Sequence, residues 1–176
     1  SIMERHFGLD LDDSPWLHAR GDAMLRLALP GFQGVLAVGD GSAHWQRGPE
    51  HQTCFVDAHS DARTSTWLRE QHLLVETGTS RQHELWLEFL WCDPSWVPTP
   101  PTAAFSPTHH FDQWGVATWH SGFSATDSAL LFKAGPPVSD AIWQSVRDGD
   151  TSAASVGTEN LHPDAGSIAW YPDGQA

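Results

Sequence analysis

The stretch CDPSWVPTPPTAAFSPTHH, residues 92–110, separates two parts of the sequence that have different patterns. It contains five of the twelve prolines of the chain. Proline lacks a backbone N–H donor and disfavours the helical conformation in the residue before it, so residues 93–108 are not expected to form a helix. We interpret residues 93–108 as a linker between one domain at residues 1–92 and a second domain at residues 109–176.

Before the linker, the apolar residues have helical spacing. The dipeptide Ser14-Pro15 is typical of a helix start, and the spacing continues up to Pro30. Two more helices are expected over residues 65–74 and 80–91, the second of which has apolar side chains four positions apart.

Beyond the linker, short runs rich in β-branched and aromatic residues alternate with Gly, Pro, Ser and Asp. Such runs predict β-strands, here over residues 114–120, 129–134, 141–147 and 167–171. Helices followed by strands predict an α+β chain with two domains of different class, and not one α/β sheet. A turn signal at residues 172–174 follows the last strand.

The two parts are each too small for a complete domain of their class. Few residues follow the last turn signal, so we expect a sheet with an unpaired edge. This predicts that the chain is a segment of a larger protein, or that a companion chain completes both domains.

The composition argues against some classes of binding partner. Its 176 residues carry a net charge of −13 with only nine Lys and Arg, which argues against a nucleic-acid partner. No apolar run reaches the roughly 20 residues that a membrane-spanning helix needs. The two cysteines, Cys54 and Cys92, lie in apolar contexts without a CxxC motif, which predicts two buried free thiols.

His162 is the best candidate metal ligand in the sequence. It lies in NLHPDAGS, just before the last expected strand, with Asn160 two residues before it and Asp164 two residues after it. Alternate residues of an extended segment face the same side, so these three can point toward one site. Imidazole with carboxylate or amide oxygens suits Zn or Mn, and a surface histidine without a role is the alternative.

The neighbours His109 and His110 form a weaker candidate. Adjacent residues of an extended segment face opposite sides, so the two imidazoles do not easily bind one ion. A solvated pair is expected there.

The loop HWQRGPEHQ, residues 44–52, is the best candidate for contacts with a sugar. Trp45 can stack on a sugar ring, Arg47 can pair with a carboxylate, and Glu50 or His51 can bind hydroxyl groups. The alternative is an ordinary polar loop packed by one tryptophan. The ten tryptophans of the chain leave the same two alternatives open, sugar platforms or core packing.

Six stretches, in order along residues 7–174, carry a resemblance to a known family. They are FGLDLDDSPWL, ALPGFQGVLAVGDGSAHWQRGPEHQTCFVD, EFLWCDPSWVPTPP, HHFDQWGVATW, ALLFKAGPP and LHPDAGSIAWYPDG. Together they resemble the heparinase II/III-like uronate lyases, in particular dermatan sulfate epimerase and its bacterial relatives. The resemblance implies the C-terminal part of an incomplete (α/α) toroid followed by the beginning of an antiparallel β-sandwich.

The resemblance also implies a chemistry and a location. Members of the family remove the C5 proton of a uronic acid in an anionic polysaccharide, with Tyr and His as base and acid. A lyase then eliminates the C4 substituent, whereas an epimerase returns the proton to the opposite face. Both reactions need the substrate carboxylate to be neutralised. A secreted or periplasmic location is favoured by the same resemblance.

The site residues carry over in part. By the resemblance, His162 matches a histidine that looks like a structural ligand of a divalent metal, Mn or Zn. Trp45 and Glu50 match a loop near the substrate groove, which also holds Arg47. Asn160 stands where many relatives have a catalytic His, and Asn can donate to a carboxylate but cannot act as an acid or base at neutral pH.

The resemblance places the catalytic Tyr and His before Ser1, and the remaining metal ligands after Ala176. We therefore expect the chain to be part of a polysaccharide lyase acting on glycosaminoglycan or alginate-like polymers, and to be inactive alone. The acidic balance favours unsulfated uronates. Two alternatives remain, a C5 uronyl epimerase and a non-catalytic carbohydrate-binding segment, and Asn160 favours the second.

Overall fold

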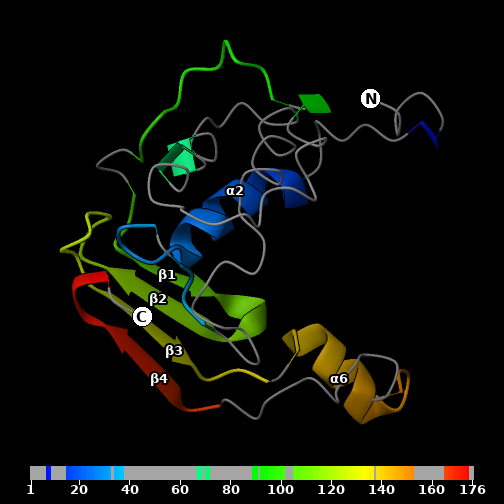
Figure 1. Cartoon of the computed structure of the whole chain (residues 1–176). Helices are drawn as coiled ribbons and strands as arrows, with labels where there is room; N and C mark the ends of the chain where they lie inside the picture. The colour runs from blue at the N-terminus through cyan, green and yellow to red at the C-terminus, as the bar shows by residue number, and fades with distance from the viewer. Residues whose placement is uncertain are drawn as a thin grey trace. The chain divides into compact units, whose positions relative to one another are not determined.

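In the residues that it describes, the computed structural model contains helices and a four-stranded sheet (Figure 1). The residues that it describes are 7–8, 15–32, 34–37, 67–68, 70–71, 89–90, 92–101, 105–136, 138–152 and 165–174. Helices combined with an antiparallel sheet confirm the prediction of an α+β chain. The chain forms two compact units, Ser1–Ala28 with Gln46–Phe105 and Leu29–Trp45 with Ser106–Ala176.

The first unit contains helix α2, Pro15–Leu27, which begins at the predicted residue. Met24 and Leu25 are buried on one side of this helix. On another side, Arg26 Nε lies 2.6 Å from Asp22 Oδ2, and the Arg26 guanidinium lies 4.2 Å from the centroid of the Phe105 ring. The apolar side therefore supplies most of the stabilisation, because an i, i+4 ion pair contributes only about 0.5 kcal/mol.

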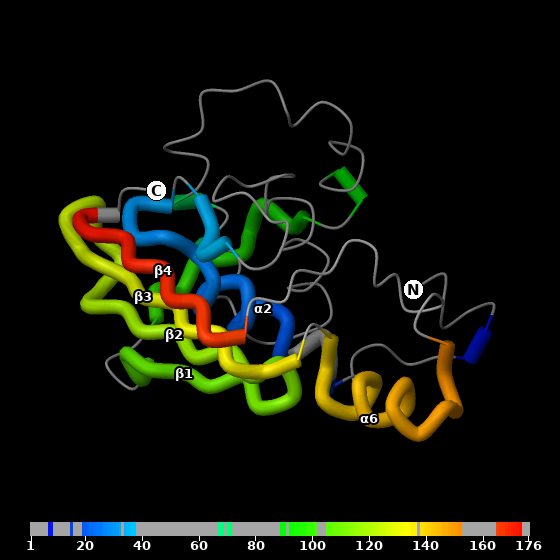
Figure 2. Tube along the Cα trace, turned by 90° about the horizontal axis from the view of Figure 1, so that it is seen from below, coloured from blue at the N-terminus to red at the C-terminus, as the bar shows by residue number. Residues whose placement is uncertain are grey.

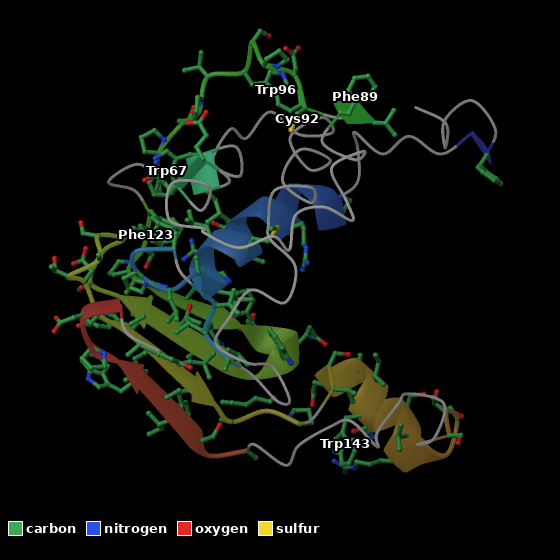
Figure 3. All side chains as sticks on the ribbon, in the orientation of Figure 1. Trp67, Phe89, Cys92, Trp96, Phe123 and Trp143 are labelled. Atoms are coloured by element: carbon green, nitrogen blue, oxygen red, sulfur yellow. The ribbon has the colours of Figure 1, made fainter. Side chains whose placement is uncertain are left out.

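Other parts of the first unit agree with the predicted helices where they are described. Residues 67–68, 70–71 and 89–90 are helical, and the side chain of Leu68 is fully buried. Phe89 is exposed (Figure 3). These residues lie within the ranges 65–74 and 80–91 that the apolar spacing indicates.

Cys92, also in the first unit and labelled in Figure 3, is disulfide-bonded, so the prediction of free thiols is wrong. The sequence contains one other cysteine, Cys54, which lies outside the described residues. The prediction was based on the absence of a short motif. A disulfide needs only suitable positions of the two cysteines in the fold, and such positions can join residues that are far apart in the sequence.

The second unit is built on an antiparallel sheet in the order β1-β2-β3-β4 (Figures 1 and 2). Its strands are β1 Thr108–Phe111, β2 Val116–His120, β3 Ala129–Lys133 and β4 Ser167–Tyr171. The alternating sequence pattern thus located β2, β3 and β4 within two residues at each end. β1 was not predicted as a strand, although its histidine pair was treated as extended.

A tight connection joins β1 to β2. It consists of the 3-10 helix η2, Asp112–Trp114, followed by Gly115 in the left-handed conformation with φ of 59°. A Cβ atom at Gly115 would overlap the backbone of Gly135, which follows β3. Glycine is needed here because the backbone has a positive φ and because two chain segments approach closely.

The prediction of a strand over residues 141–147 is wrong. Helix α6, Asp140–Asp148, occupies that range. Ser139 caps the N-terminus by accepting a hydrogen bond from the N–H of Ile142, and Gly149 ends the helix in the left-handed conformation. These two caps outweigh the strand preference of the β-branched and aromatic residues between them.

One face of the sheet is buried. Its buried side chains are Val116, Thr118, His120, Ala129, Leu131, Lys133 and Tyr171. Three residues of the Leu29–Trp45 part of this unit are also buried, namely Leu29, Phe32 and Leu36. Phe32 stacks on Phe123 with the ring centroids 5.8 Å apart. The Leu29–Leu36 segment therefore contributes to the core of the second unit.

Candidate functional site

The residues assigned to a site from the sequence lie outside the described part of the chain. They are Trp45, Arg47 and Glu50 in the candidate sugar-binding loop, and Asn160 and His162 in the candidate metal-binding segment. Their positions and roles therefore stay predictions.

The described segments that flank these two stretches are each hydrogen-bonded to the sheet, near opposite ends of β4. The N–H of Ala37 donates to the hydroxyl oxygen of Tyr171 at 3.3 Å, so the segment before the loop is bonded to the end of β4. The N–H of Gly166 donates to the carbonyl of Lys133 at 2.7 Å, so the segment after His162 is bonded to the end of β3. Both flanks are part of the second unit.

Lys133 is a buried cation that the sequence analysis missed. Its side chain is 2 % exposed, and Nζ donates to the carbonyl oxygens of Trp114 at 3.0 Å, Pro136 at 2.7 Å and Gly135 at 3.4 Å. These carbonyls belong to the two connections that meet at Gly115 and Gly135. The hydrogen bonds compensate the buried charge of the ammonium group. They also link the β1–β2 connection to the segment that follows β3.

His120 is a second buried polar residue that the sequence analysis missed. It lies at the end of β2, and its ring centroid is 5.4 Å from that of Phe123. Its backbone N–H donates to the carbonyl of Pro107 at 2.9 Å. The alternation of β2 is the signal that could have placed it, because His120 shares a face with Val116 and Thr118.

The two histidines of β1 face opposite sides of the strand, as the extended geometry predicts, but the expectation of a solvated pair is confirmed for His110 alone. His110 is exposed, and its Nδ1 lies 2.7 Å from Asp112 Oδ1. His109 is half-buried, with its ring centroid 4.4 Å from that of Phe111. The two imidazoles have different partners, in agreement with neighbours that face opposite sides of a strand.

The loop between β2 and β3 contains a carboxylate with a lowered pKa. Asp127 accepts hydrogen bonds from the Ser121 hydroxyl at 2.9 Å and from the Ser124 N–H at 2.8 Å. These two bonds, the Ser121 bond foremost, lower the pKa of Asp127 below its ordinary value of 3.8. The hydrogen bonds stay within the loop, so we assign Asp127 a structural role.

The described residues contain no group of three or more His, Cys, Asp or Glu side chains that could hold a metal ion. His162 is outside those ranges, so this finding does not bear on it. In the same ranges, no helix has the length and hydropathy needed to cross a membrane.

The face of the sheet opposite Lys133 is unusually apolar. Trp119 of β2 and Trp170 of β4 stack with ring centroids 6.0 Å apart and an interplanar angle of 21°. Phe132, Ile168 and Trp170 are exposed on this face. The more usual outer face of an antiparallel sheet is polar, so this surface is a candidate for binding.

No protein-family model matches the chain.

Proposed function

We propose that the chain is part of a polysaccharide lyase that abstracts the C5 proton of a uronic acid and eliminates the C4-linked sugar. The observation that carries the proposal is the resemblance of six stretches, in the same order, to the heparinase II/III-like uronate lyases. The helix-before-sheet order of the described elements is compatible with the fold of that family. On this proposal, α2 belongs to an (α/α) toroid and the sheet begins a β-sandwich.

The proposed roles follow the chemistry of each residue. Trp45 stacks on a sugar ring, Arg47 pairs with a substrate carboxylate, and Glu50 accepts hydrogen bonds from hydroxyl groups. Asn160 donates to the carboxylate of the uronate whose C5 proton is removed. This hydrogen bond becomes stronger as negative charge develops on that carboxylate, which lowers the barrier.

The proposed metal ligand is His162, and the ion is Mn or Zn. Imidazole suits both ions, and the role proposed for the ion is structural. The test is the metal content of the purified protein. We expect His162→Ala to lose the ion and His110→Ala, a matched exposed histidine on β1, to keep it. Equal metal content in the two variants would remove the assignment.

The disulfide at Cys92 supports a periplasmic or extracellular location, because disulfides persist in oxidising compartments. This is also where a polymer-degrading enzyme meets its substrate. The acidic net charge of −13 favours unsulfated glycosaminoglycans or alginate over heavily sulfated polymers.

The decisive experiment uses the protein expressed from its complete reading frame. We expect hyaluronan, unsulfated chondroitin or alginate to give the ultraviolet absorbance of unsaturated uronate. Asn160→Ala should lower kcat by roughly 100-fold, because one donor to the developing charge is lost. Gln113→Ala, a matched exposed amide in η2, should leave kcat unchanged.

Two results would select the alternatives. Deuterium exchange at C5 without chain cleavage would identify a C5 uronyl epimerase. Binding of uronate oligosaccharides with neither cleavage nor exchange would identify a non-catalytic carbohydrate-binding protein, which the presence of Asn160 in place of a catalytic histidine favours.

A further inference from the structure

The outer face of the sheet is formed by alternate residues of three strands. In the register of the sheet, Leu130 lies between Trp119 and Trp170, and Phe132 lies between Ala117 and Ile168. The outer face consists of six residues: Ala117, Trp119, Leu130, Phe132, Ile168 and Trp170. Its three most exposed members are Ile168 at 67 %, Trp170 at 52 % and Phe132 at 37 %.

The two tryptophans form an ordered aromatic surface. Their centroid distance of 6.0 Å and angle of 21° correspond to an offset stack. Trp119 is the less exposed of the two, while Trp170 keeps half of its surface accessible. Contact with Trp119 therefore fixes the orientation of the Trp170 indole, so a planar ligand need not order that side chain on binding.

The charges indicate what kind of ligand fits. The outer face contains no Asp, Glu, Lys or Arg, although the chain has a net charge of −13. An ionic ligand would have no charged partner among these six residues, and two copies of a chain with this net charge repel each other at long range. An uncharged ligand meets neither difficulty.

Polar residues of β1 lie along one edge of the same face and indicate which class of uncharged ligand it can bind. Thr108 of β1 is the register partner of Trp119, and His110 is the partner of Ala117. Both are exposed, and both offer hydrogen-bonding groups beside the apolar surface. A ligand that matches this arrangement has an apolar ring face and hydroxyl groups at the ring edge.

We propose that the outer face binds a neutral oligosaccharide, with one pyranose ring stacked on the exposed indole of Trp170. The axial C–H bonds of such a ring form an apolar face whose weakly positive hydrogens meet the negative face of the indole. Trp119 is a positioning residue, and the hydroxyl groups reach toward Thr108 and His110. This inference uses no carboxylate contact, so it is separate from the proposed lyase chemistry, but it requires that the second sheet of the proposed β-sandwich does not pack on the outer face.

The test is a titration of the protein from its complete reading frame with cellohexaose, followed by tryptophan fluorescence and calorimetry. We expect a dissociation constant near about 1 mM that stays constant as NaCl rises from about 0.1 to 1 M, because no ion pair is formed. Trp170→Ala should weaken binding at least about tenfold, the loss of one stacked ring. Trp143→Ala, on α6 (Figure 3), is the control and should bind as the parent does.

Two substitutions of Trp119 test whether its ring positions Trp170. Trp119→Phe keeps an aromatic ring against Trp170 and should retain binding, whereas Trp119→Ala should weaken it severalfold. Circular dichroism and urea unfolding of each variant show whether the fold is intact. Trp170→Phe, which keeps a ring at an exposed position, should retain part of the affinity and serves if Trp170→Ala does not fold.

Two outcomes would overturn the proposal. One is the absence of any fluorescence change or heat with cellohexaose at about 10 mM, a concentration well above the expected dissociation constant. The other is failure of acrylamide to quench Trp170, measured as the difference between the parent and Trp170→Phe, because another sheet or protein surface would then cover the outer face.

Discussion

At the scale of single residues, Lys133 is expected to contribute strongly to stability. Its Nζ donates to three backbone carbonyls inside the second unit. Lys133→Met keeps the alkyl chain but leaves those acceptors without their donor, so the free energy of unfolding should fall by about 3 kcal/mol. Urea unfolding measures this. Arg147→Met on the exposed side of α6 should change it by less than about 0.5 kcal/mol, and an equal effect of both would contradict the role of Lys133.

Substitutions of Gly115 and Gly149 can distinguish the cost of a positive φ from the cost of a steric overlap. Both have a positive φ, 59° and 81°, but a Cβ at Gly115 would overlap Gly135, whereas a Cβ at Gly149 meets nothing within 4 Å. Gly149→Ala should cost about 1 kcal/mol from backbone strain alone. Gly115→Ala should cost at least about 3 kcal/mol, because the two connections must also move apart. Thermal unfolding tests this order, and similar losses would show that backbone strain alone explains both.

Asp127 links stability to pH. A carboxylate whose pKa is lowered in the fold stabilises the fold above the unfolded pKa, and this contribution is lost as pH falls through the lowered pKa. Asp127→Asn should therefore lower the Tm at pH 7, and the difference from the parent should shrink below about pH 3.8. Asp150→Asn, at an exposed position after α6, is the control. A Tm difference that is constant with pH would exclude ionisation of Asp127 as the cause.

At the scale of elements, α6 depends on its caps. None of its residues is buried, and the side chain of Ser139 accepts from the N–H of Ile142 at 3.4 Å. Ser139→Ala should destabilise the helix locally by about 1 kcal/mol and leave global unfolding almost unchanged. Hydrogen exchange of the α6 amides should therefore become about fivefold faster. Ser139→Asp, which restores a cap, should return the exchange rate to that of the parent.

Most of the elements that were predicted correctly have a buried face; β4, in which only Tyr171 is buried, is the exception. β2 and β3 alternate in burial along their whole length, and their residues alternate between the two faces in the same way. α2 has an N-terminal Ser-Pro signal and a buried side. In α6, the β-branched and aromatic residues Ile142, Trp143 and Val146 favour a strand. None of the residues of α6 is buried, so no buried face indicated a helix instead of a strand. The short β1 has a pattern that becomes recognisable only beside β2.

At the scale of the whole molecule, Cys92 of the first unit is disulfide-bonded. We expect no thiol to react in the folded chain, and Cys92→Ser to expose one thiol. The same substitution should lower the free energy of unfolding by about 2–4 kcal/mol, because a crosslink restricts the unfolded chain. Thiol titration with and without denaturant checks the first expectation, and urea unfolding checks the second. A reactive thiol in the unreduced parent would contradict the bond.

The sequence by itself determined where most strands and the first helix lie, because periodicity and end signals act over a few neighbouring residues. It also carried the motifs on which the proposed lyase function rests, including Asn160 and His162. The tertiary structure alone decided which face of the sheet is buried, and that Lys133 is surrounded by carbonyl groups. It also brought Trp119 and Trp170 together across β3. These features depend on contacts between residues distant in the sequence, and a local pattern contains no information about such contacts.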